Sequence, residues 1–173
     1  MNADNQQERL TIGFYIAGFT DGEGSFHVAF EKRPSVTLGW QIIPEFHISQ
    51  HKNDLKLLHF IQKYLGCGTI RPNHRGNQGD ENQVLVVRNR KDLTNLIIPF
   101  FMKFKLRSSK AKDFEKFKTI LALLNKDCHK TKTGFNKIVE LAYAMNKNGK
   151  YRKRNKHILL ESSETIRQTT KTK

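Results

Sequence analysis

The sequence predicts an α+β domain whose helices and strands follow one another in the order αββαββα. Three observations predict it: apolar residues recur at helical spacing in some segments, they alternate with polar residues in others, and the helix, strand, strand order occurs twice. Four antiparallel strands can then form one curved sheet with helices covering a single face. The other face is left free for a ligand, and a chain of 173 residues can bury enough surface for one such domain.

The first half of the chain is expected to fold as helix, strand, strand and helix. An almost unbroken apolar run is followed by Gly22 and Gly24, which predicts a short buried helix stopped by glycines. Two segments of alternating character follow, and a second apolar stripe at helical spacing ends at Gly66. The expected elements are a helix over residues 10–19, strands over residues 26–31 and 40–50, and a helix from residue 53 or 54 to residue 65.

The second half repeats this order with a hairpin and further helices. A polar, glycine-containing loop separates two β-branched segments, and Ser108 or Ser109 is expected to cap a helix with an apolar stripe. Residues 1–157 are expected to form the domain, and residues 158–173 a basic, mobile tail. The expected elements are strands over residues 69–71 and 83–88, helices over residues 93–101 and 135–145, and between these helices the helix capped at residue 108 or 109, whose apolar stripe covers residues 114–124.

The charge of the chain points to a polyanionic partner. Lys and Arg number 31 against 16 Asp and Glu, which gives a formal net charge of +15. Such an excess favours nucleic acid, because neutralising phosphates releases counterions and supplies affinity. A membrane surface and ribosomal RNA remain alternatives on charge alone, but a curved antiparallel ribbon fits the DNA major groove, so topology and charge agree on DNA.

The cysteines and the N-terminal sequence indicate in which cellular compartments the protein is expected. Cys67 and Cys128 stand alone, without metal-ligand spacing, so neither a disulfide framework nor a zinc site is expected. The polar first ten residues are unlike a secretory signal, and no apolar run is long enough to span a bilayer. We therefore expect no membrane partner and no secretion.

One segment carries most of the functional information. Residues 15–26, Tyr-Ile-Ala-Gly-Phe-Thr-Asp-Gly-Glu-Gly-Ser-Phe, closely resemble the LAGLIDADG signature, with Glu23 at the last acidic position. Looser resemblance extends over residues 46–51 and residues 106–110, in the order and spacing of the family. The chain is therefore similar to homing endonucleases of the LAGLIDADG type, and the resemblance spans about 150 residues.

The motif also has a physical rationale of its own. Ala17 and Gly18 lack bulk, so two such helices can approach closely and form a seam between subunits. A two-fold axis along this seam would bring two copies of Glu23 together beneath the DNA, one for each strand. Only one signature is present, so symmetry must supply the second site and the enzyme is expected to be a homodimer with a roughly palindromic target. The expected interface residues are Phe14, Ala17, Gly18 and Asp21, and for Asp21 a cap of the helix is the alternative to a hydrogen bond across the helix pair.

The resemblance implies a set of catalytic residues. Glu23 would bind the divalent metal together with the carbonyl of Gly22, Gln50 would hold a water molecule, and Lys110 would stabilise charge at the phosphate. Mg²⁺ is the implied cofactor, and Mn²⁺ or Ca²⁺ could replace it for binding. Two points are open: the active-site lysine could instead be Lys105 or Lys112, and some relatives have a basic residue where this chain has Asp54, for which Lys52 or Lys56 could substitute.

Contacts to double-stranded DNA are expected from side chains on the free face of the sheet. If Phe46 and Ile48 pack inward, strand alternation turns their neighbours outward. Arg and Gln among them can pair with guanine and adenine edges. The candidates are His27, Arg33, Gln41, Glu45, His47, Ser49, Arg71, Asn73, His74, Arg75, Gln83 and Arg88.

The implied function is a site-specific endonuclease that makes double-strand breaks and promotes the mobility of the intron that encodes it. One alternative is a maturase that binds intron RNA on the same scaffold, and another is a regulator that only binds DNA. Intact Glu23, Gln50 and Lys110 favour cleavage, because RNA binding does not need a carboxylate at the seam. An organelle, either chloroplast or mitochondrion, is the expected location in a eukaryote, and the cytoplasm otherwise.

Overall fold

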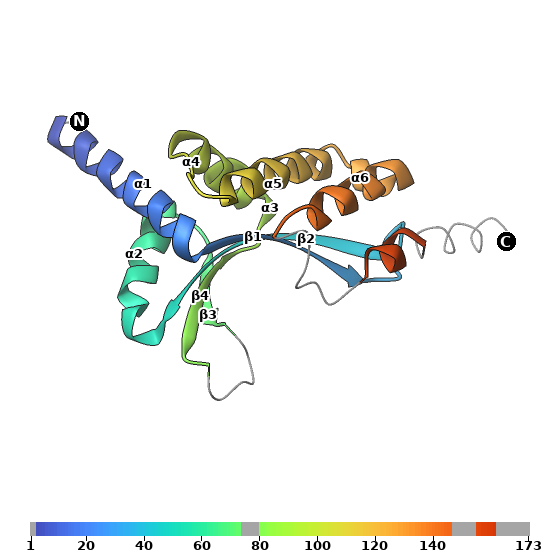
Figure 1. Cartoon of the computed structure of the whole chain (residues 1–173), viewed down its shortest axis with the longest axis horizontal. Helices are drawn as coiled ribbons and strands as arrows, with labels where there is room; N and C mark the ends of the chain where they lie inside the picture. Colours follow the sequence, from blue (N-terminus) through green and yellow to red (C-terminus); the bar gives the residue numbers. More distant parts are fainter. Residues whose placement is uncertain (1–2, 74–79, 147–154, 162–173) are drawn as a thin grey trace, which may run out of the picture. The chain divides into compact units, whose positions relative to one another are not determined.

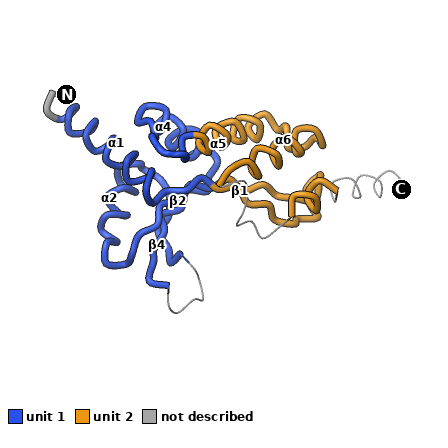
Figure 2. The backbone as a smooth tube through the Cα atoms, viewed as in Figure 1, with its two compact units in different colours: residues 1–26, 45–111 blue, residues 27–44, 112–173 orange. Residues whose placement is uncertain are grey.

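The protein is known from a computed structural model, which describes residues 3–73, 80–146 and 155–161. The chain divides into two compact units, shown in Figure 2. Unit 1 contains residues 1–26 and 45–111, and unit 2 contains residues 27–44 and 112–173. The boundary between domain and tail at residue 157 stays a prediction.

The first helix, α1, spans Ala3–Glu23 and is longer than the sequence indicated. It begins in the polar N-terminal segment, continues past residue 19 and Gly22, and ends at Glu23, directly before Gly24. Gly13 is needed for packing, because a Cβ atom there would lie 2.2 Å from the ring of Phe104. A Cβ atom at Gly18 or Gly22 would meet nothing within 4 Å, so these two glycines lie on a free surface of the helix.

Four strands form one sheet in the order β1-β2-β4-β3 (Figure 1). The strand β3 pairs with β4 antiparallel, as the hairpin pattern predicted, and β2 also pairs with β4 antiparallel, a pairing that the sequence did not specify. In the β2–β4 register Phe46 faces Val87 and Ile48 faces Leu85, and all four side chains are fully buried. The bounds are β1 Gly24–Lys32, β2 Trp40–His51, β3 Thr69–Pro72 and β4 Asn82–Val87.

Helices of unit 1 bury one face of this sheet. Phe101 in the helix α4 (Ile98–Lys103) packs edge to face against both Phe26 and Phe46, with ring centroids 5.5 and 5.3 Å apart. The helix α2 (Leu55–Leu65) ends at Gly66, which has a φ of 71° and is the left-handed cap that the sequence predicted. A short helix, α3 (Arg90–Asp92), and a π-helical turn lead into α4.

Unit 2 has its own apolar core. Phe30 contacts the rings of Phe135 and Tyr143, and Phe135 is fully buried. The helices here are α5 (Lys110–Asn125), which starts in unit 1, and α6 (Lys132–Tyr143). Residues 156–161 are helical and Leu159 is buried, whereas residues 162–173 of the predicted tail lie outside the described residues. Among the helices described, none has the length and apolar character needed to cross a membrane.

Candidate active site and nucleic-acid interface

The C-terminal end of α1 receives a lysine from the start of α5. The Nζ of Lys110 donates hydrogen bonds to the carbonyl oxygens of Asp21, at 2.7 Å, and Gly22, at 2.8 Å. Carbonyls in the last turn of a helix lack intrahelical partners and carry the negative end of the helix dipole, so an ammonium group is stabilised there. Of the three candidate lysines, Lys110 is thus the one that the fold brings to the acidic end of the motif.

The carboxylate of Asp21 holds this arrangement together. It accepts hydrogen bonds from the backbone N–H of Arg107, at 2.7 Å, and from the N–H and hydroxyl of Ser108, at 3.1 and 2.6 Å. Burial favours the neutral acid, but the hydrogen bonds from Ser108 and Arg107 and the charge of Lys110 outweigh it and lower the pKa of Asp21. Asp21 therefore fixes the segment before α5 within its own chain. Its place in a subunit seam stays a prediction.

Ser108 links this anchor to the start of α5. Its hydroxyl donates to Asp21 and accepts the backbone N–H of Lys110 at 3.2 Å, so it caps the helix as predicted. The contact of Arg107 and Ser108 with Asp21 was not predicted from the sequence. Their place in the segment resembling the family, just before Lys110, was the available signal.

Glu23 is the last residue of α1 and is exposed. Within the described part of the chain its carboxylate has no hydrogen bond or ion pair, so it is available to a ligand. Carboxylate and carbonyl oxygens are the donors that hard divalent cations prefer, and Glu23 and Gly22 supply one of each. No group of three or more His, Cys, Asp or Glu side chains lies together among the described residues. Among the described residues, the end of α1 thus offers two kinds of oxygen donor, the carboxylate of Glu23 and the carbonyl of Gly22.

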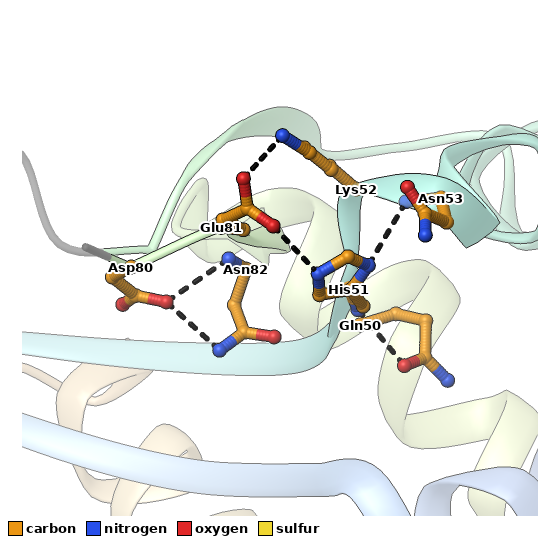
Figure 3. Close-up of polar contacts among 7 residues, drawn as sticks. All are labelled: Gln50, His51, Lys52, Asn53, Asp80, Glu81 and Asn82. Carbon is orange, nitrogen blue, oxygen red and sulfur yellow. Dashed lines mark hydrogen bonds and ion pairs between the residues drawn. The ribbon is translucent and has the colours of Figure 1, made fainter. Parts of the chain in front are cut away.

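Gln50 lies at the end of β2, opposite Gln83 in the register with β4. Its Oε1 accepts the backbone N–H of His51 at 2.9 Å, as Figure 3 shows. Since this donor identifies the oxygen, the Nε2 of Gln50 remains as a hydrogen-bond donor. No hydrogen bond joins Gln50 to Glu23 or to Lys110 among the described residues.

A charged cluster adjoins Gln50 at the ends of β2 and β4 (Figure 3). The carboxylate of Glu81 accepts a hydrogen bond from Lys52 and lies 3.1 Å from the Nε2 of His51. The hydrogen bonds from Lys52 and His51 lower the pKa of Glu81. Lys52, expected as a substitute for a missing active-site cation, is thus already paired with a carboxylate.

The face of the sheet opposite α4 carries polar and cationic side chains, and we name it the polar face. Cross-strand partners share a face, so the register places His47, Val86 and Thr69 in one row and Ser49, Val84 and Arg71 in the next. A hollow of about 400 Å³ opens on this face. It is lined by Thr69, Arg71, Val86 and Arg88.

Two of the predicted DNA contacts have a different environment from the one expected. Glu45 is 4% exposed, and its carboxylate binds Arg88 and lies 2.8 Å from the Nε2 of His47. Burial raises the pKa of Glu45, but the hydrogen bond and charge of His47, together with Arg88, outweigh this and lower it. Gln83 shares the parity of Leu85 and Val87 and therefore belongs to the covered face, not to the polar face.

The remaining predicted contacts divide between the units. In unit 2, burial alternates along β1 and leaves His27 partly exposed, as predicted, while Arg33 donates to the Oε1 of Gln41 at 2.8 Å. In unit 1, Asn73 follows β3, and its backbone oxygen lies 3.4 Å from an Nη of Arg71. His74 and Arg75 lie outside the described residues.

One side of α1 carries large apolar side chains that are exposed. Phe14 is 59% and Tyr15 50% exposed, and Gly18 lies on the same side of the helix. Ala17, by contrast, is 3% exposed because it faces the interior of its own chain. Of the two small residues on which the predicted seam rests, Gly18 lies on the free surface of the helix and Ala17 does not.

Unit 1 thus contains an exposed carboxylate at the end of α1, an ammonium group anchored beside it, and a sheet face with cationic side chains. The chain belongs to the LAGLIDADG endonuclease family, whose model matches residues 16–121. It is 37% identical over 131 residues to the Neurospora crassa protein named "Probable intron-encoded endonuclease 3". It is 31% identical over 129 residues to the DNA endonuclease I-CeuI of Chlamydomonas moewusii.

The matches cover most of this chain but only part of these two relatives. They span 75% and 73% of the chain, and 24% of the Neurospora protein and 58% of I-CeuI. Among solved structures, the homing endonuclease I-TnaI has a TM-score of 0.75 and 36% identity, with 89% of this chain and 97% of that chain covered. I-SmaMI bound to cleaved DNA has a TM-score of 0.74 and 37% identity, with 79% and 44% covered.

Proposed function

We propose that the protein is a site-specific endonuclease that makes double-strand breaks in DNA by metal-dependent hydrolysis. The observation that carries this proposal is the contact of Lys110 with the last turn of α1, next to the carboxylate of Glu23, which has no partner among the described residues. A binding protein has no need to keep an exposed acid beside DNA, where it repels phosphates. A hydrolase needs that acid to hold a cation.

The metal would be held by the carboxylate of Glu23 and the carbonyl of Gly22, and Mg²⁺ is the ion we propose. Both donors are oxygen atoms, which suits Mg²⁺, and a relative, I-SmaMI, was solved on uncleaved DNA in the presence of calcium ions. When bound, such an ion polarises the phosphoryl oxygens and lowers the pKa of a bound water. Gly22 also accepts a hydrogen bond from Lys110, and its second lone pair remains for a metal.

Gln50 and Lys110 are proposed to position a water molecule and to stabilise charge on the phosphate. The Nε2 of Gln50 can donate a hydrogen bond to a water molecule or a phosphate oxygen, because its Oε1 is held by the N–H of His51. The ammonium group of Lys110 has three hydrogens, of which the carbonyls of Asp21 and Gly22 accept two. The third can donate to the phosphate as negative charge accumulates during hydrolysis.

Replacing Lys110 with Met is expected to slow cleavage by roughly 100- to 1000-fold, the usual effect of removing one donor to a developing oxyanion. DNA binding should change much less, because one of many cationic contacts is lost. Single-turnover cleavage and equilibrium binding measure the two effects separately. Lys105→Met is the matched control, since Lys105 is an exposed lysine near the same segment. Equal losses in both variants would refute the assignment of Lys110.

We further propose that the active enzyme is a homodimer formed through α1. The exposed side of this helix carries Phe14, Tyr15, Gly18 and Gly22, and the two glycines are four residues apart, so a second helix can approach closely along them. The match covers 97% of the I-TnaI chain but only 44% of the I-SmaMI chain. A second copy of this chain would supply what one copy lacks, including the second Glu23.

Replacing Gly18 with Leu is expected to convert the dimer into a monomer, because the added side chain separates the helices. Light scattering of the wild type should give about twice 20.1 kDa, and the variant about that mass. Ala122→Leu, at an exposed position of α5, is the control for a similar increase in volume. A monomeric wild type, both free and on DNA, would exclude the dimer.

The proposed function itself is tested by selection followed by cleavage. The wild-type protein is incubated with randomised duplexes in Ca²⁺, bound sequences are recovered, and a cloned consensus is then exposed to Mg²⁺. We expect one long, roughly palindromic sequence to be enriched and cut on both strands. Enrichment of no sequence, or binding without cleavage in Mg²⁺ or Mn²⁺, would count against the proposal.

We propose that the gene lies within an intron, as the names of the Neurospora relatives state for those proteins. An intron in an organelle genome is the proposed setting in a eukaryote. The consensus from the selection can then be compared with the exons that flank the gene. A target that spans their junction is expected, because insertion of the intron interrupts the site.

A further inference from the structure

Glu45 is a buried acid on the polar face, the face of the sheet that contacts DNA in the proposed function. Only 6% of its side chain is exposed, compared with 59% for Arg88 and 23% for His47, which both contact its carboxylate. A negative charge on this face opposes DNA binding, and its burial costs free energy unless it is paired. A side chain in this position therefore calls for a role other than contacting DNA itself.

The geometry of the ion pair suggests that role. The Oε1 of Glu45 accepts a hydrogen bond from the Nε of Arg88 and forms an ion pair with its Nη2, and these two nitrogens lie on one side of the guanidinium group. The guanidinium group has five N–H donors in a rigid plane. Two are used by Glu45, and the end formed by Nη1 and the outer hydrogen of Nη2 remains for another acceptor.

Arg88 also lines the hollow of about 400 Å³ on the polar face, together with Thr69, Arg71 and Val86. An arginine fork pairs bidentately with the O6 and N7 atoms of guanine. Because the pair with Glu45 limits rotation of the guanidinium group, less conformational entropy is lost when the fork binds.

We propose that Arg88 reads a guanine in each half of the target and that Glu45 is the positioning residue that aims its guanidinium group. The inference rests on the proposed function, since it concerns the sequence preference of the same enzyme. His47, bound to the other oxygen of Glu45, completes the pairing of the buried carboxylate. The charge on Glu45 thus serves recognition by holding Arg88, without itself touching the base.

The experiment compares bound sequences selected from randomised duplexes in Ca²⁺ for the wild type and for Arg88→Lys. Lysine keeps the charge and can still pair with Glu45, so the fold and the attraction to phosphates are preserved, but it lacks the planar fork. We expect a guanine preference of roughly 5- to 150-fold at one position of each half-site in the wild type. In Arg88→Lys this preference should fall below about threefold, with every other position unchanged.

Two further variants separate reading from positioning. Glu45→Gln removes the charge but keeps the shape, and it should weaken the preference at the same position without altering the others. Glu31→Gln is the matched control, because Glu31 is an exposed acid in β1 that loses the same charge. A merely structural role for Glu45 would instead lower affinity for all sequences alike.

The outcomes distinguish this inference from the proposed function. If the wild type selects and cuts a target but Arg88→Lys selects the identical sequence with the same preferences, the inference is wrong and the function stands. The same holds if Arg71→Lys, and not Arg88→Lys, removes the guanine preference. If the wild type enriches no sequence, both the function and the inference are overturned.

Discussion

Replacing Glu23 with Gln is expected to abolish DNA cleavage while leaving sequence-specific binding largely intact. The carboxylate of Glu23 is exposed at the end of α1 and is proposed to hold the divalent ion. Gln has the same shape but no charge, so the affinity for the ion falls and several kcal/mol of stabilisation of the transition state is lost. A loss of about 4 kcal/mol slows the reaction roughly 1000-fold. Single-turnover cleavage in Mg²⁺ measures it.

The DNA affinity of Glu23→Gln shows whether the variant still folds and recognises its target. The loss of one negative charge beside DNA should leave affinity equal to that of the wild type or slightly higher, because contacts to bases and phosphates are retained. Glu8→Gln, at an exposed position of the same helix, is the control and should cut normally. Wild-type cleavage by Glu23→Gln would show that the active site lies elsewhere, and a binding or RNA-splicing role would then be favoured.

Much of the fold could be predicted because local sequence patterns determine where most of its strands and helices form. Alternation along β1 and β2, the hairpin of β3 and β4, and the glycine at the end of α2 all follow from local chemistry, and each was found within a few residues. The length of α1 could not be predicted in this way. Its polar first turns have no apolar face, and Gly22 suggested an earlier end, whereas the helix continues to Glu23.

The candidate site was predicted only as far as the motif reaches. Glu23, Gly22 and Lys110 were named from the signature and from the segment before α5, and the fold brings Lys110 to the helix end. Residues that act through partners distant in the sequence were placed less well. The anchor at Asp21 depends on a segment 86 residues away, so its role within the chain was not apparent from its neighbours.

Strand parity explains the other differences. Alternation placed Glu45 on the polar face, but it could not indicate that Arg88, 43 residues later, would pair with it and bury it. Gln83 lies in β4 and Arg88 directly follows this strand. The two are an odd number of residues apart, so their side chains belong to opposite faces of the sheet. Glu81, just before β4, pairs with Lys52, just after β2. This contact depends on the register of β2 with β4.

DNA affinity is expected to fall by roughly 1000- to 100,000-fold when salt is raised from 50 to 200 mM. Each chain carries a formal charge of +15, so a dimer can neutralise on the order of ten phosphates, and each neutralisation releases counterions. Equilibrium binding of the selected duplex in Ca²⁺ at several salt concentrations gives the slope. A scrambled duplex of the same length is the control and should show a similar slope at weaker affinity, because phosphate contacts do not depend on sequence.

The slope also separates the two kinds of cation proposed for this protein. Arg88→Lys keeps its charge, so its slope should equal that of the wild type even though its base preference changes. Lys52, which is paired with Glu81, should contribute little to the slope, whereas Lys110→Met should reduce it by about one contact. A nearly flat dependence on salt would mean that the excess charge serves a partner other than DNA, and the assignment of the polar face to DNA would fail with it.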